Sequence, residues 1–136
     1  MTSQKAIARS WASILREAGE PPVRLVAPAE FRERTGYGLN AYVGRASPQD
    51  GLIVVKKNRP LADIKNTLWH ELLHILFPSR PHWWIECAAA ILSRTGQTGR
   101  YSRKYGHTPA DLPPRAKLVR MCRRSSERLA QSNRAY

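Results

Sequence analysis

Apolar residues recur every three or four positions in several stretches of this 136-residue chain, which indicates amphipathic helices packed on a shared core. The pattern predicts four main helices: one from a Ser3 cap to a stop at Gly19, one from Leu61 through the residues before Pro78, one over Trp83–Ser93, and one from Pro114 or Arg115 to about Gln131. A brief helix or turn is also expected at 29–34.

Three shorter runs favour β-strands. Residues 23–26 alternate between apolar and polar side chains, and two β-favouring runs, 39–44 and 52–57, flank the turn-rich segment 47–51. These two runs predict an antiparallel hairpin. The expected fold is therefore α+β: a small, mostly antiparallel sheet packed on the central helix, with a second helix after it and further helices at both termini.

The charge is unevenly distributed along the chain. Residues 1–93 carry 12 basic and 8 acidic side chains, whereas residues 94–136 carry 11 and 2. We expect a core at 1–94 and a basic segment at 95–136 whose helix packs on the same domain. Such a segment is typical of nucleic-acid binding and equally of a solvated basic surface. In its helix, an inward apolar face and an outward basic face are expected, the latter made by Arg120, Arg123, Arg124 and Arg128.

The sequence has no apolar run long enough to span a membrane, and its first residues lack the apolar core of a signal peptide. A cytoplasmic protein without membrane contacts is expected. Cys87 and Cys122 are too few for a disulfide framework and are predicted to be free thiols.

The candidate chemistry lies in the central helix, in the sequence His70-Glu71-Leu72-Leu73-His74. Residues four apart lie one turn apart on the same helix face, so His70 and His74 can bind one metal ion. Glu71 lies beside them, where it can act as a general base on water. Two imidazoles and an adjacent carboxylate favour Zn²⁺.

Two residues compete to be the third metal ligand. Glu86 falls within the apolar helix over Trp83–Ser93, where a carboxylate needs a metal or a cationic partner. A buried ion pair with Arg45 or Arg94 is the structural alternative. His82, four residues earlier, can also approach the metal, or cap that helix. Glu86 is the favoured ligand.

The motif of His70 to His74, followed by Phe77-Pro78 and then Trp84-Ile85-Glu86, resembles the gluzincin metallopeptidases. The compact spacing is most similar to the minigluzincins and related small phage and prokaryotic metallopeptidases. The resemblance covers residues 52–92 and implies a zincin-like core. It also implies a zinc endopeptidase with ligands His70, His74 and Glu86 and catalytic Glu71.

Such an enzyme hydrolyses peptide or protein substrates, and an extended substrate can pair with the edge of a strand beside the active-site helix. Candidate hydrogen-bond donors to the oxyanion of the reaction are Tyr101, Arg103, Tyr105 and His107. His82 is a further accessory residue, which can line the cleft and contact the substrate if it does not bind the metal. Three alternatives stay open: a DNA-associated protease of the SprT-like kind, a repressor-cleaving protease, and an inactive zinc-binding protein of a mobile element. The segment after Arg94 is also a candidate latch over the cleft.

Overall fold

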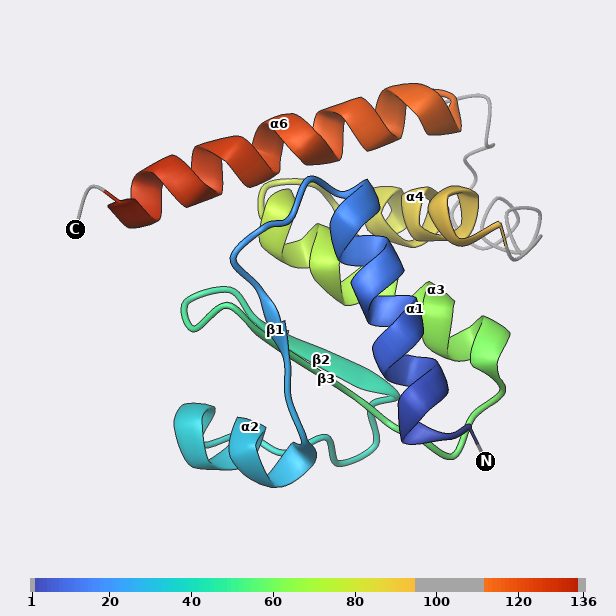
Figure 1. The fold of residues 1–136 in the computed structure, drawn as a ribbon, viewed down its shortest axis with the longest axis vertical. Coiled ribbons are helices and arrows are strands. Elements are labelled where there is room, and N and C mark those ends of the chain that lie inside the picture. The colour runs from blue at the N-terminus through green and yellow to red at the C-terminus, as the bar shows by residue number, and fades with distance from the viewer. Residues whose placement is uncertain (1, 95–111, 135–136) are drawn as a thin grey trace.

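The computed structural model describes residues 2–94 and 112–134. In these two ranges it contains five helices and three strands, so the α+β class is confirmed (Figure 1). In chain order the elements are α1 (Gln4–Glu17), β1 (Arg24–Leu25), α2 (Pro28–Thr35), β2 (Gly44–Ser47), β3 (Leu52–Val55), α3 (Leu61–Leu76), α4 (His82–Ser93) and α6 (Arg115–Arg134). No described helix is both long and apolar enough to cross a membrane.

The sheet has the order β1-β3-β2 and is mixed rather than mostly antiparallel. β2 pairs with β3 antiparallel, with Gly44 opposite Val55 and Ser47 opposite Leu52, while β1 pairs with β3 parallel. All four residues of β3 are buried, because this central strand has protein on both faces.

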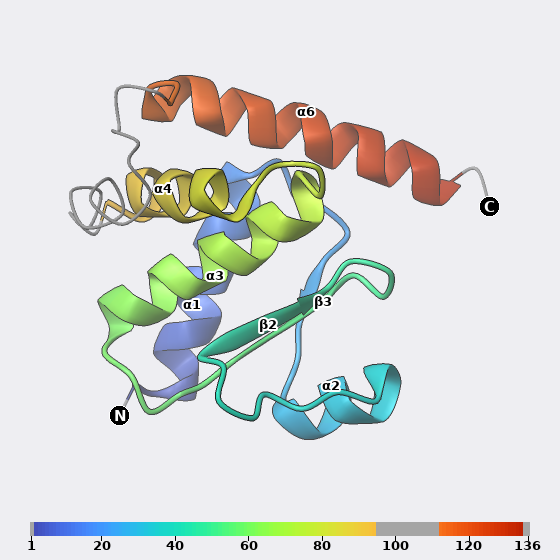
Figure 2. The same cartoon turned by 180° about the vertical axis from the view of Figure 1, so that it is seen from behind.

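The two faces of β3 belong to different cores. Ile53 and Val55 face the larger core, formed with α1, α3 and α4, whereas Leu52 and Val54 pack with Phe31 of α2. Figures 1 and 2 show the same layering, with α2 on one side of the sheet and α3 on the other. The alternation of side chains along a strand accounts for the division.

The first strand of the predicted hairpin was placed wrongly. Residues 39–43 form a turn, in which the Tyr42 amide donates to the Leu39 carbonyl (2.9 Å), and the strand begins only at Gly44. The hairpin turn itself lies where expected. Its Gly51 has φ 64° and lies so close to Pro22 that an added Cβ would be 2.9 Å from the Pro22 carbonyl oxygen.

The helix predictions are confirmed to within a few residues. Ser3 caps α1, accepting a hydrogen bond from the Ala6 amide (3.1 Å). Pro60 and Pro81 immediately precede α3 and α4. Proline is tolerated at a helix start because its backbone nitrogen carries no hydrogen and no helical hydrogen bond is lost there. The predicted short helix at 29–34 is α2.

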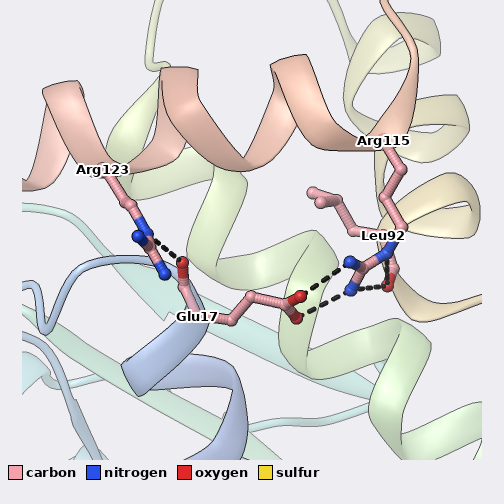
Figure 3. A network of polar contacts seen from close by, with 4 residues as sticks. All are labelled: Glu17, Leu92, Arg115 and Arg123. Carbon is pink, nitrogen blue, oxygen red and sulfur yellow. Dashed lines mark hydrogen bonds and ion pairs between the residues drawn. The ribbon is translucent and has the colours of Figure 1, made fainter.

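Helix α6 packs on the core through an arginine network (Figure 3). Arg115 donates from Nη1 and Nη2 to the Glu17 carboxylate (2.6 and 2.7 Å) and from Nε and Nη2 to the Leu92 carbonyl (3.1 and 3.0 Å). Arg123 Nε donates to the Glu17 carbonyl (3.0 Å). Leu118 and Cys122 are buried and Met121 and Leu129 half-buried. The four arginines of the predicted outward face are exposed, but Arg123 also lies against the end of α1 beside Gly19 and so does not simply point outward.

Candidate metal centre

Helix α3 places two histidine side chains together in a cleft. The Nε2 atoms of His70 and His74 are 3.1 Å apart, and their ring centroids are separated by 4.8 Å. The helix is held in this orientation by its buried apolar face, which includes Leu68, Leu72 and Leu73. The i, i+4 spacing therefore brings the two imidazoles together, as the sequence predicts.

The first residue of α4 brings a third imidazole to the same place. The ligand atoms of His70, His74 and His82 all lie within 4.8 Å of one another, which forms a group able to hold a metal ion. The His82 ring centroid is 5.0 Å from that of His70 and 5.5 Å from that of His74. Ligand nitrogens about 2.0–2.1 Å from a tetrahedral Zn²⁺ are roughly 3.3 Å apart, so a small inward movement of His82 would complete such a site.

Glu86 lies one turn further along α4, next to His82. Its Oε1 is 3.0 Å from His82 Nε2, and only 14% of its side chain is exposed. Its other oxygen, Oε2, is buried without a hydrogen-bond partner among the described residues. The alternative of a buried pair with an arginine is not found in the part of the chain that the structure describes: Arg45 donates to the Gly38 carbonyl, and Arg94 lies near Glu17 instead. The structure thus brings both candidate third ligands to the site, and the choice between them stays a prediction.

Burial and mutual proximity keep the first two imidazoles neutral. Burial, followed by the neighbouring His74 and His82, lowers the pKa of His70 to about 3. Burial and His82 also lower the pKa of His74, against a smaller opposing effect of Glu86. Neutral imidazole is the form that binds metals, so no proton has to be removed for binding at neutral pH.

Glu71 follows His70 on α3 and lines the same cleft. Burial raises the pKa of its carboxyl group to about 7. A carboxylate whose pKa is near neutrality can both accept and return a proton at physiological pH. The prediction that Glu71 lies beside the two histidines is therefore matched by an environment suited to a general base.

The cleft runs between α3 and the edge of the sheet. A cavity of about 450 Å³ is lined by residues of β2 and the loops beside it, of α3, and of both ends of the α3–α4 turn: Tyr42, Gly44, Arg45, Ala46, Pro48, His70, Glu71, His74, Pro78 and His82. A second cavity of about 260 Å³ adjoins it and reaches Glu86. Tyr42, Gly44 and Arg45 were not singled out from the sequence as cleft residues; the available signal was a glycine next to an arginine and close to an aromatic residue.

Gly44 allows strand and helix to approach closely beside Glu71. A Cβ at this position would lie 2.4 Å from Thr67 Cγ2 and 3.4 Å from Glu71 Cγ. Only a residue without a side chain fits this approach. The edge strand consequently lies directly against the candidate catalytic residue.

A larger cavity, of about 650 Å³, lies on another face of α3, between α1, α4 and Arg115. It contains none of the histidines and neither Glu71 nor Glu86. The chemistry rather than the volume identifies the candidate site. Tyr101, Arg103, Tyr105 and His107 lie outside the described residues, as does the first part of the candidate latch.

No protein-family model, curated protein or solved structure matches this chain.

Proposed function

We propose that this chain is a zinc-dependent peptidase that hydrolyses peptide bonds in the cleft between α3 and β2. The observation that carries the proposal is the placement of Glu71 beside the paired nitrogens of His70 and His74, 3.1 Å apart, in one cleft. The resemblance to gluzincins supports the same interpretation. Nucleic-acid binding by the basic tail remains a separate prediction.

The donor set fits zinc. His70 and His74 would hold it, with either Glu86 or His82 as the third protein ligand, and the unpartnered Oε2 of Glu86 would gain a cation nearby. A bound Zn²⁺ would lower the pKa of water and polarise a substrate carbonyl. Glu71 would take the proton from the attacking water and return it to the leaving amine.

The backbone of β2 supports a peptide as substrate. The Lys56 amide donates to the Val43 carbonyl (2.9 Å), so the antiparallel alternation directs the amides and carbonyls of 43, 45 and 47 toward β3. Those of Gly44 and Ala46 consequently point away from β3, at the edge that lines the cleft. An extended peptide can pair with these groups as an added strand and would then pass alongside Glu71.

The developing oxyanion needs a hydrogen-bond donor. Tyr42 lines both cavities of the cleft and carries a phenol hydroxyl, so we assign it as the candidate donor among the described residues. His82 would share this role if Glu86 is the metal ligand.

The test is metal analysis of the purified protein together with cleavage of an unstructured protein substrate. We expect Zn²⁺ in both wild type and Glu71→Gln, and cleavage by wild type only, with a loss of at least about 100-fold in the variant. Asp63→Asn, which neutralises a half-buried carboxylate in the first turn of the same helix, away from the cleft, is the matched control and should cleave normally. Equal cleavage by wild type and Glu71→Gln would refute the proposal.

A further inference from the structure

Arg45 of β2 is a half-buried cation at the rim of the cleft. Its Nη1 donates to the Gly38 carbonyl (3.0 Å), and its guanidinium carbon lies 4.6 Å from the Tyr37 ring centroid and 5.4 Å from that of Tyr42. No carboxylate of the described residues forms an ion pair with it, whereas the exposed Arg24 and Arg34 both pair with Glu30. The carbonyl of Gly38 occupies one of the five N–H donors that the guanidinium carries. Arg45 is thus fixed in place, and its other N–H donors can bind a ligand.

The loop that holds Arg45 also exposes apolar surface. Among the described residues the exposed large hydrophobic side chains are Tyr37 (59%), Tyr42 (58%) and Val43 (39%), all in one loop beside the cleft. Exposed aromatic side chains gathered at one place are typical of a binding surface. The loop and Arg45 together therefore present aromatic rings and a cation to whatever occupies the β2 edge.

The register of β2 and β3 determines how a bound peptide would pair with Arg45. Gly44 and Ala46 direct their backbone groups to an added strand. If the peptide runs antiparallel to β2, the peptide residue opposite Arg45 would form a non-hydrogen-bonded pair with it. In such a pair the two side chains lie on the same face of the sheet, with Cα atoms only about 4.5 Å apart. A side chain of opposite charge at that peptide position would meet the guanidinium directly.

We propose that Arg45 selects an acidic side chain in a peptide bound along the β2 edge, at the residue facing Arg45. The inference rests on the proposed function for its setting and adds a substrate class to it: peptides with Asp or Glu close to the hydrolysed bond. Tyr37 and Gly38 position the guanidinium, which limits the conformational entropy that it loses on binding.

The experiment uses short unstructured peptides that differ only in having Glu, Gln or Lys at one position, which is moved one residue at a time along the peptide. Cleavage is measured as kcat/KM with the zinc-loaded wild type, and binding as Kd with zinc-loaded Glu71→Gln. At one position relative to the cleaved bond we expect Glu to be preferred over Gln by about fivefold in both measurements, the upper range for a cross-strand ion pair. Arg45→Glu should reverse the preference, favouring Lys over Glu at that same position.

The matched control is Arg32→Glu, which makes the same change of charge on the exposed side of α2 and lines neither cavity. It should retain the wild-type preference. A role of Arg45 limited to holding the loop would weaken binding of all three peptides alike and would leave the order of preference unchanged, which would overturn the proposal.

Failure of the proposal and failure of the proposed function are distinguishable. Cleavage without charge preference at any position overturns the role of Arg45 and leaves the peptidase intact. Selective binding of Glu peptides that are never cleaved supports the role of Arg45 and refutes the peptidase. Absence of binding to every peptide overturns both.

Discussion

Substitution of Gly44 by alanine tests whether close contact between β2 and α3 builds the cleft. The new Cβ would lie 2.4 Å from Thr67 Cγ2, where unstrained carbon atoms are about 3.5–4.0 Å apart, so strand and helix would have to separate by about 1 Å. Overpacking of this kind costs about 1–3 kcal/mol. Gly44 does not have a positive φ, so alanine recovers about 0.4–1 kcal/mol through the unfolded chain. The net expected loss is about 0–2.6 kcal/mol in the free energy of unfolding.

Thr67 cannot relieve the overlap cheaply by rotating. Its Oγ1 donates to the Asp63 carbonyl (2.9 Å), and a different rotamer would lose that bond, worth about 1 kcal/mol. Thr67→Ser removes Cγ2 while it keeps the hydroxyl. The closest remaining neighbours of an alanine at position 44 would then be the Val54 carbonyl oxygen at 3.3 Å and Glu71 Cγ at 3.4 Å, which small shifts can accommodate.

The assay is a double-mutant cycle in urea. Wild type, Gly44→Ala, Thr67→Ser and the double variant are unfolded, and we expect a coupling of about 1 kcal/mol or more, with the double variant more stable than Gly44→Ala. Peptide cleavage should follow the same order, because the added methyl moves the strand edge away from Glu71. Additive effects of Gly44→Ala and Thr67→Ser on stability would refute the close approach of β2 and α3.

Two further predictions concern the packing of α6 and the metal ligands. The hydrogen bonds from Arg115 have the largest effect in lowering the pKa of Glu17. This interaction therefore stabilises the fold fully at pH values above the ordinary pKa of 4.5, and the stabilisation is lost as the pH falls through the lower pKa that Glu17 has in the folded state. The urea midpoints of wild type and Glu17→Gln should accordingly differ at pH 7 and converge in acid; a constant difference would contradict this. Zinc affinity of His82→Gln and Glu86→Gln, measured by competition with a chelator, should show which of the two residues is the third ligand. Replacing the residue that binds zinc should lower the affinity by more than about 100-fold, and replacing the residue that only holds the ligand in place should lower it by about 10–100-fold. Unchanged affinity in both would remove α4 from the site.

The helices were predictable because their apolar periodicity coincides with strong local signals. Ser3 precedes α1 as its cap, and Pro60 and Pro81 precede α3 and α4. In each case the local preference and the burial pattern indicate the same boundary. The positions of His70, Glu71 and His74 followed directly, since helical spacing alone brings them to one face.

The sheet was less predictable because tertiary contacts override strand propensity. Tyr42 and Val43 favour strands, yet they are exposed in a turn, while Gly44 and its successors have weak β-propensity and form β2. Gly44 is required by the approach of α3, which no local pattern reveals. The parallel pairing of β1 with β3 joins segments separated by helix α2 and strand β2, so its direction could not be read from either strand.

The third ligand illustrates a limit of spacing arguments. His82 and Glu86 are four residues apart on α4, so any geometry that brings one toward the metal brings the other. If His82 binds through Nδ1, Glu86 accepts from its Nε2 and fixes the ring, as carboxylates do behind many metal-bound histidines. If Glu86 binds through its free Oε2, His82 steadies the carboxylate instead. In both arrangements a cation would offset the burial of the Glu86 carboxylate, because its Oε2 has no hydrogen-bond partner among the described residues. Glu86 is therefore an argument for a metal at this site whichever of the two residues binds it.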